Sequence, residues 1–190
     1  METLARLFGS ETKVKILRLF LFNDEHVFYM KEIVERTKSD LTSVKKEMPN
    51  LLKMSLIRKR KIKGKHGYSL NTQFLELRAL RSFLVNLEPL SENMIIKNLS
   101  KAGSLKLILT AGIFIQDPES RVDILVVGDA IKKAGLEKAV KILESEVGKE
   151  LKYAYFSTND FKYRISMFDK LTRDILDYPH KIVLNKLGNL

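Results

Sequence analysis

Apolar residues recur at helical spacing in the first quarter of the chain. Ser10 can cap a helix, and the apolar positions behind it are three or four residues apart: Val14, Leu17, Phe20 and Leu21. A second, short helix is predicted near residues 30–37, and a third begins near residue 41 after a turn at residues 38–40. The pattern predicts three consecutive helices joined by short turns.

The third helix has a proline within its pattern. Its apolar side consists of Leu41, Val44, Met48, Leu51 and Leu52. Proline has no backbone N–H, and its ring crowds the preceding helical turn. We therefore expect Pro49 to kink or divide this helix and to make it short.

Two strand-like segments follow, at residues 56–62 and 68–70, around a tip that contains Gly64 and Gly67. This pattern predicts a β-hairpin. Six of the eight residues from Arg58 to Lys65 are Lys or Arg, so the hairpin is strongly cationic. A basic hairpin directly after a set of helices is typical of proteins that bind nucleic acid.

Three helices followed by a hairpin resemble the winged-helix transcription regulators of bacteria and archaea, over about residues 8–82. The residues that carry the resemblance are the turn at Thr37–Asp40, the third helix, the segment Lys53–Ile57 and the hairpin. The resemblance implies a domain that binds double-stranded DNA, with the third helix in the major groove. The candidate DNA-binding residues are Thr42, Ser43, Lys45, Lys46, Arg58, Arg60, Lys61, Lys63, Lys65 and His66.

These candidates divide into two groups with different expected contacts. Lys45 or Lys46 could pair with guanine, and Thr42 and Ser43 could contact a base or a phosphate. The hairpin residues are expected along phosphates or in the minor groove, and about half of them can face one surface because a strand alternates its faces. The alternative for the helix lysines is that they only solvate an exposed helix.

Residues 74–87 form another helical pattern. Leu77, Leu80, Leu84 and Leu87 are spaced 3-4-3, as in the seam of a coiled coil. This spacing indicates either a dimerisation helix, and with it a homodimer, or a helix that packs on its own chain. Pro89 and Ser91 then end the pattern, so we place one domain at residues 1–90 and a second at residues 91–190.

The second half alternates strand and helix patterns. Strands are predicted at residues 105–109, 122–127, 151–156 and 181–184. A helix is predicted near residues 131–147, and two short helices near 159–165 and 168–176. Together with the first half, this predicts an α+β chain.

This second layout resembles the minimal domains of the polymerase-beta-type nucleotidyltransferases, over about residues 95–187. The carriers are Ala111-Gly112, residues 122–129, residues 147–153 and residues 168–184. The resemblance implies a small α/β domain with a mixed sheet. Active members use a Gly-Ser turn for the nucleotide phosphates, an Asp-x-Asp pair and a third acidic residue for two Mg²⁺ ions.

Most of that catalytic set is replaced in this chain. Ile113 stands in place of the serine, Arg121 in place of the first Asp, and Lys152 near the place of the third carboxylate, whereas Asp123 matches the second Asp. Two-metal chemistry needs carboxylates that neutralise both ions. We therefore expect no catalytic residue, no metal and no cofactor, with an active transferase as the less favoured alternative.

A degenerate domain of this kind has two interpretations. It can be a sensor that binds a nucleotide or another anionic effector without metal, in a pocket of Gly112, Arg121, Asp123 and Lys152, or it can be a packing module without a ligand. Asp123 can also have a structural role, bonded to the backbone or paired with Arg121.

The charge distribution separates the two halves. The net charge is +11, of which residues 1–82 contribute +9 and residues 83–190 contribute +2. This asymmetry indicates a polyanionic partner for the first half, and a generally basic protein is the alternative. The absence of cysteine, of an N-terminal signal-like segment and of a long apolar run leads us to expect a cytoplasmic protein with no membrane partner.

From the sequence we therefore expect a DNA-binding transcription regulator whose second domain is an inactive, nucleotidyltransferase-like sensor or interaction module. One alternative is an active nucleotidyltransferase that modifies a protein or RNA and uses the winged helix for targeting. Another is an RNA-binding protein, although the hairpin region has few aromatic residues (mainly Tyr68) on which bases could stack.

Overall fold

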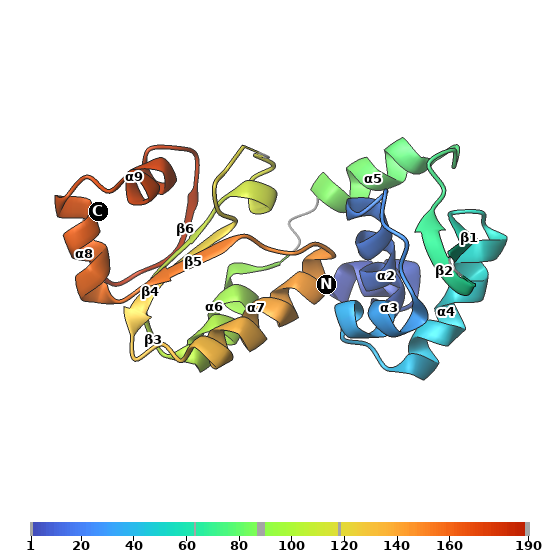
Figure 1. Cartoon of the computed structure of the whole chain (residues 1–190), viewed down its shortest axis with the longest axis horizontal. Helices are drawn as coiled ribbons and strands as arrows, with labels where there is room; N and C mark the ends of the chain where they lie inside the picture. The colour runs from blue at the N-terminus through green and yellow to red at the C-terminus, as the bar shows by residue number, and fades with distance from the viewer. Residues whose placement is uncertain (1, 63, 87–89, 118, 189–190) are drawn as a thin grey trace. The chain divides into compact units, whose positions relative to one another are not determined.

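The computed structural model describes residues 2–62, 64–86, 90–117 and 119–188. The chain divides into two compact units, each with helices and strands (Figure 1). The first comprises Met1–Pro89 together with Glu144–Lys149, and the second comprises Leu90–Leu143 together with Glu150–Leu190. The protein is an α+β chain, as the sequence predicts.

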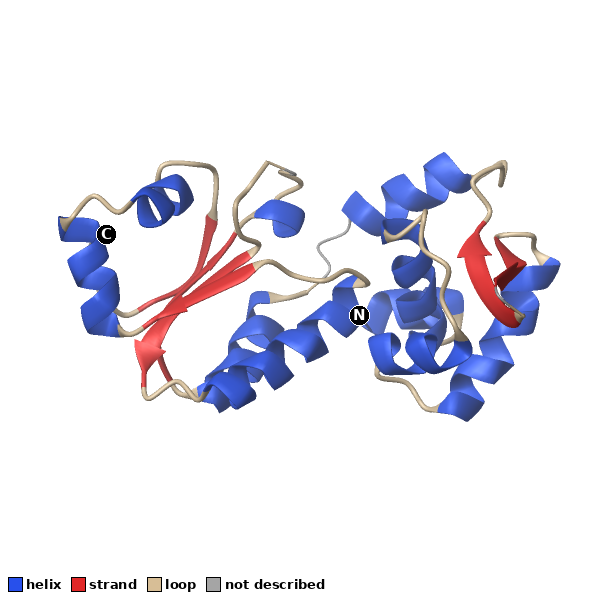
Figure 2. Cartoon of the chain, in the orientation of Figure 1, coloured by secondary structure: helices blue, strands red, loops and turns tan. Residues whose placement is uncertain are grey.

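The first unit contains a group of helices followed by a hairpin and a further helix (Figure 2). Its elements are α1 (Glu2–Phe8), α2 (Glu11–Phe22), α3 (Met30–Thr37), α4 (Leu41–Lys53), β1 (Ile57–Ile62), β2 (Lys65–Leu70) and α5 (Leu77–Asn86). Ser10 caps α2, and its hydroxyl accepts a hydrogen bond from the Lys13 amide at 3.2 Å. The three predicted helices correspond to α2, α3 and α4, and the predicted hairpin corresponds to β1 and β2. Helix α1 was not predicted.

The core of this unit is built around α2, which is buried along most of its length. Val14, Phe20, Ile33, Val44 and Leu51 are all within 2 % of complete burial. They bring α2, α3 and α4 onto one apolar cluster, which the base of the hairpin also joins. This packing fixes the position of α4 and of the first strand.

The leucines of α5 pack within their own unit. Leu84 is 1 % exposed and belongs to the core, and Leu77 and Leu80 lie partly buried against it. Leu87, the fourth leucine of the predicted seam, lies outside the described residues. At the three described positions, the leucines therefore pack on their own chain, which is the second of the two alternatives that the spacing allows.

The second unit is a four-stranded sheet with helices. Its elements are α6 (Glu92–Leu99), β3 (Ser104–Thr110), β4 (Ile124–Asp129), α7 (Lys133–Val147), β5 (Tyr153–Phe156), α8 (Thr158–Ser166), α9 (Lys170–Leu176) and β6 (Lys181–Asn185). The strand order is β5-β4-β3-β6. Strand β3 is antiparallel to β4 and β6, and β4 is parallel to β5, so the sheet is mixed as expected.

Each strand and helix predicted in this half is present, with shifts of a few residues at the ends. Helix α6 was not predicted. Ser91, which the sequence places at a domain boundary, is its N-cap and accepts a hydrogen bond from the Met94 amide at 3.4 Å.

One face of the sheet is covered by α8 and α9. Leu107, Leu109, Leu125 and Val127 form a cluster with helix residues on this face. Phe161 of α8 is completely buried in the cluster. Helices α6 and α7 lie on the other side of the sheet (Figure 1).

Candidate nucleic-acid interface

The turn between α3 and α4 is fixed by two local devices. Lys38 ends α3 with a left-handed backbone (φ 51°). Asp40 caps α4, and its carboxylate accepts a hydrogen bond from the Ser43 amide at 2.8 Å. Hydrogen bonds from Ser43 lower the pKa of the Asp40 carboxyl from its ordinary value, so the cap is charged at neutral pH. The first turn of α4 is thus held in a defined direction.

Helix α4 presents its predicted contact residues on the side away from the core. Val44, Met48 and Leu51 are buried, whereas Thr42, Lys45 and Lys46 are exposed and Ser43 is half-buried. One prediction for this helix is wrong, because Leu41 is 46 % exposed and does not belong to its apolar side. It is the first residue of the helix, where the chain has only begun to turn toward the core.

The prediction that Pro49 divides or shortens this helix is also wrong. Helix α4 runs for 13 residues, from Leu41 to Lys53, with Pro49 inside it. The side chain of Pro49 is exposed, so water can reach the backbone on that side and satisfy the carbonyl that has no N–H partner.

An acidic residue of α4 is turned inward, which the sequence analysis missed. Glu47 is 6 % exposed, and its carboxylate lies 3.2 Å from Nζ of Lys13 in α2. Its spacing of three residues from Val44 and four from Leu51 was a usable signal, since these positions share a helix face. Burial of this carboxylate leaves Lys45, Lys46 and Lys53 as the charged side chains on the exposed side of α4.

The hairpin divides its cations between two faces. Strands β1 and β2 are antiparallel, with pairs that run from Ile57↔Leu70 to Ile62↔Lys65. Cross-strand partners share a face, so one face carries Arg58, Arg60 and Lys65 and the other carries Lys59, Lys61 and His66. The sequence predicts this division, but Lys59 was not among the candidate residues. Lys63 lies outside the described residues.

Two arginines of the hairpin are positioned by neutral partners. Nε of Arg60 donates to the Ser69 hydroxyl at 3.2 Å, and a guanidinium N–H of Arg58 donates to the Gln73 side-chain oxygen at 3.1 Å. Within the described part of the chain, no carboxylate forms an ion pair with a cation of β1. The positive charges of this strand therefore remain available to an outside anion.

Strand β2 lies between β1 and a short extended segment at Phe28. The amides of Phe28 and Tyr68 each donate to the other's carbonyl at 2.8 Å. A Cβ added to Gly67 would come within 2.6 Å of the Val27 side chain, which explains the glycine at this point of the strand. Strand β1 is thus the outer strand, and its lysines also discourage pairing with another chain, which is a structural alternative to ligand binding.

The charge of the region is high relative to its size. Residues 38–70 contain ten Lys or Arg and two Asp or Glu, a net charge of +8 out of +11 for the chain. Of the two acidic residues, Asp40 caps α4 and Glu47 is paired with Lys13. The described Lys and Arg side chains of this segment are exposed, so the core of the unit is not built from them.

In the second unit, Asp123 connects two backbone segments. Its carboxylate oxygens accept hydrogen bonds from the Ile113 amide at 2.9 Å and from the Lys152 amide at 2.7 Å. Gly112 has a left-handed backbone (φ 55°), and a Cβ there would clash with the Asp123 carboxylate. Among the predicted pocket residues, Gly112, Asp123 and the backbone of Lys152 are therefore brought together.

Arg121 does not join this group. Its Nε lies 2.7 Å from a carboxylate oxygen of Asp174 in α9. Two structural roles were predicted for Asp123. The hydrogen bonds to the backbone are confirmed, whereas the predicted pairing with Arg121 is wrong, because Arg121 pairs with Asp174. Both residues lie in bends before β4 rather than in a regular strand, so their spacing of two does not place them on one face.

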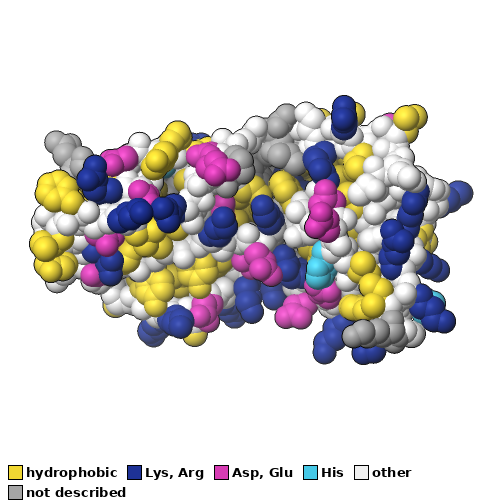
Figure 3. All heavy atoms as spheres, turned by 45° about the horizontal axis from the view of Figure 1, so that its top comes forward, with side chains coloured by type: hydrophobic (Ala, Val, Ile, Leu, Met, Phe, Trp, Pro, Cys, Tyr) yellow, Lys and Arg dark blue, Asp and Glu magenta, His cyan; other side chains and the backbone are white. Residues whose placement is uncertain are grey.

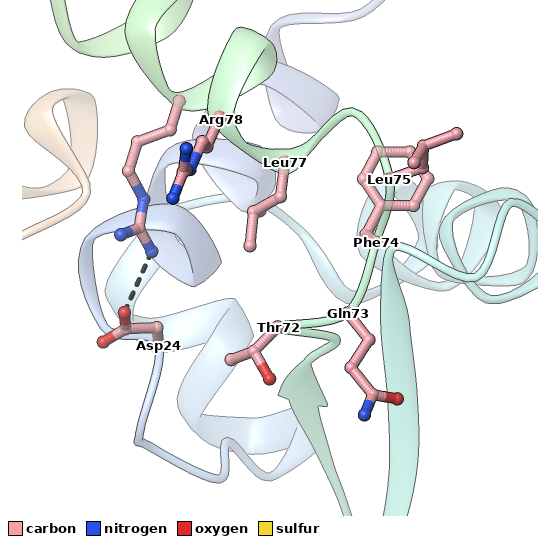
Figure 4. A pocket seen from close by; sticks show the side chains of 8 residues that line it. Asp24, Thr72, Gln73, Phe74, Leu75, Leu77 and Arg78 are labelled. Atoms are coloured by element: carbon pink, nitrogen blue, oxygen red, sulfur yellow. Dashed lines mark hydrogen bonds and ion pairs between the residues drawn. The ribbon is translucent and has the colours of Figure 1, made fainter.

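A hollow of about 410 Å³ opens in the first unit beside α5 (Figure 4). Its lining is mixed polar and apolar, and the Arg81 guanidinium lies 2.9 Å from the Asp24 carboxylate at its rim. The lining residues are Asp24, Thr72, Gln73, Phe74, Leu75, Leu77, Arg78 and Arg81. None of the predicted site residues lines it.

The described residues contain neither a metal-binding cluster nor a membrane-spanning helix. No group of three or more His, Cys, Asp or Glu side chains is arranged to hold a metal ion. No described helix is both long enough and apolar enough to cross a membrane.

Comparisons with known proteins do not place the chain in a family. A scan of protein-family models, a search of curated proteins and a search of solved structures each found no match.

Proposed function

We propose that the first unit is a winged-helix domain that binds double-stranded DNA, and that the protein is a transcription regulator. The observation that carries this proposal is the set of exposed cations on α4 and on the outer strand β1, which form no ion pair with a carboxylate among the described residues. DNA presents a dense line of phosphates to such cations, and binding there releases counterions.

The two elements have different roles in this proposal. The N-terminal part of α4, with Thr42, Lys45 and Lys46, enters the major groove and contacts base edges. The β1–β2 hairpin contacts phosphates, with Arg58, Arg60 and Lys65 on one face and Lys61 and His66 on the other. Sequence preference then resides in the helix, and most of the affinity resides in the hairpin.

For the second unit we propose a degenerate nucleotidyltransferase-like domain that does not transfer nucleotides. The observation in support is that Asp123 lacks the two partner carboxylates, because Arg121 and Lys152 stand in or near their places and Arg121 is paired with Asp174. One carboxylate cannot neutralise and orient two metal ions. The unit acts either as a sensor of an anionic effector, such as a nucleotide, or as an interaction module.

The experiment that tests the DNA-binding proposal is selection from a pool of random duplexes, with the wild-type chain and with Lys45→Ala and Lys46→Ala. We expect the wild type to enrich a defined sequence and at least one variant to relax one or two positions of it, with about a tenfold loss for the preferred duplex. A matched control is Lys53→Ala, which changes an exposed lysine at the far end of the same helix.

Two results would contradict the proposal. One is that the wild-type chain enriches no sequence from the pool. The other is that each lysine variant loses affinity equally for all duplexes, since that would place Lys45 and Lys46 on phosphates.

A further inference from the structure

The hollow beside α5 has a size and a lining that suit a small ligand. Its volume is about 410 Å³. Sites for small molecules commonly enclose roughly 300–1,000 Å³ and combine an apolar lining with a few polar groups. Phe74 and Leu77 supply the apolar part, and both pack against the core of the first unit. Figure 4 shows Leu77 and Arg78 extending from α5 toward the hollow.

Two arginines of α5 give the hollow its positive charge. Lys and Arg side chains are spread over the face of the molecule that Figure 3 shows, so an exposed cation by itself marks no site. Arg78 and Arg81 differ from such cations because both line the hollow. They are three residues apart and therefore share a helix face. Among the described residues, Arg78 has neither a hydrogen-bond partner nor an ion-pair partner.

Arg81 is engaged only in part by its own carboxylate partner. One of its guanidinium nitrogens lies 2.9 Å from Asp24, and the two side chains are 40 % and 44 % exposed. Nε of Arg81 has no hydrogen-bond partner among the described residues, so Asp24 does not bind the group in the bidentate manner. Asp24 is the only carboxylate among the described residues of the lining. Two guanidinium groups thus share one carboxylate.

The segment that faces α5 across the hollow is held in place before any ligand binds. Asn71 is 5 % exposed, and its amide donates to the Ser55 carbonyl at 2.7 Å. Its side-chain oxygen accepts from the Gln73 amide at 3.1 Å, and its carbonyl accepts from the Phe74 amide at 3.0 Å. These bonds fix the backbone from which Thr72 and Gln73 line the hollow. A preformed wall reduces the entropy that is lost on binding.

We propose that this hollow binds a small organic anion. Its carboxylate or phosphate group is held by Arg78 and Arg81, because the planar guanidinium group matches both kinds of anion. Its apolar part lies against Phe74 and Leu77. Phosphates of a DNA backbone would leave this apolar lining unused, so a free ligand fits the site better. The proposal does not depend on DNA binding.

The test is a titration of the amide NMR spectrum of the full chain with phenyl phosphate, with benzoate and with benzyl alcohol, at constant pH and ionic strength. We expect the two anions to cause saturable shifts in residues 72–81, with a Kd on the order of 1 mM for ligands of this size. The tighter of the two shows whether the anionic group is a phosphate or a carboxylate. Benzyl alcohol has the ring without the charge and is expected to cause no saturable shift.

Two substitutions are expected to change the affinity in opposite directions. Arg78→Ala removes one guanidinium group and should weaken anion binding at least about tenfold. Asp24→Asn removes the carboxylate that competes for Arg81 and should strengthen binding about threefold or more. The matched control is Arg173→Ala, which removes an exposed guanidinium group from α9 and changes the net charge as Arg78→Ala does. This control is expected to bind both anions as the wild type does.

Four results would overturn the proposal. The first is the absence of saturable shifts with both anions up to about 20 mM. The second is benzyl alcohol binding as tightly as the anions. The third is an equal loss in Arg78→Ala and Arg173→Ala, which would assign binding to net charge. The fourth is unchanged or weaker binding in Asp24→Asn, which would leave Arg81 as a partner of Asp24 alone.

Discussion

At the scale of single residues, Asp123 is the clearest case of a side chain whose contacts define its role. It joins the turn after β3 to the segment before β5 through two backbone amides. Asp123→Asn would place an amide N–H₂ against one of those N–H donors. We expect the second unit to lose about 1–3 kcal/mol of unfolding free energy, measured by urea denaturation.

Asp177→Asn is the matched control for this prediction. Asp177 is 60 % exposed and pairs with Arg173 on the surface of α9. An exposed pair of this kind contributes little, so its loss is expected to change stability by less than about 1 kcal/mol. Equal stability of the Asp123 variant and the wild type would refute the bracing role of Asp123.

Pro49 gives a second prediction at this scale. It is exposed inside a continuous helix, where proline costs about 3 kcal/mol relative to alanine. Part of that difference is offset, because proline also restricts the unfolded chain. We expect Pro49→Ala to stabilise the first unit by about 2 kcal/mol in chemical denaturation, and a destabilised variant would contradict this reading of α4.

The sequence determined some of these residue roles and left others open. Helical spacing alone assigns Val44 and Met48 to the core and Lys45 and Lys46 to the surface. The partners of Asp123 could not be chosen in this way, because they lie 10 and 29 residues away in sequence. Such contacts depend on how the sheet is assembled, which periodicity does not encode.

At the scale of elements, the β1–β2 hairpin is proposed to supply most of the affinity for DNA. Arg60 and Lys61 lie on opposite faces of β1, so at least one of them is expected on phosphate. We expect Arg60→Glu/Lys61→Glu to weaken binding to every duplex and to reduce the slope of log affinity against log salt by about one or two. Fluorescence anisotropy over a range of salt concentrations measures both.

The control for the hairpin variant has the same change in net charge at a distant place in sequence. Lys138 and Lys141 are exposed lysines of α7 in the second unit. Lys138→Glu/Lys141→Glu is expected to retain the wild-type slope. If the two double variants lose affinity to the same extent, then net charge rather than the hairpin governs binding.

Predictions for elements succeeded where a strong period or a cap residue was present. The hairpin, the strands of the sheet and the helices from α2 to α4 follow from such signals. Helix α6 was missed because Ser91 and Pro89 were interpreted as a boundary, although serine before an acidic residue is also a helix start. The use of the α5 leucines could not be predicted, since the same 3-4-3 spacing suits a core and a dimer seam.

At the scale of the whole molecule, charge and apolar exposure are separated along the chain. Residues 38–70 carry +8 of the net charge, whereas most exposed large hydrophobic residues described in the second unit lie between residues 163 and 182. The charge asymmetry was visible in the sequence. The exposure of these hydrophobic residues was not, because residue type alone does not distinguish an exposed apolar side chain from a buried one.

The central claim is that this protein is a sequence-specific DNA-binding regulator. The most direct measurement is an anisotropy titration of the full chain against a duplex from upstream of its own coding region and against a scrambled duplex, at low salt and at about 0.15 M. We predict a preference for the native duplex that persists at the higher salt. Equal binding to both duplexes that disappears at the higher salt, or no binding to either, would contradict the claim.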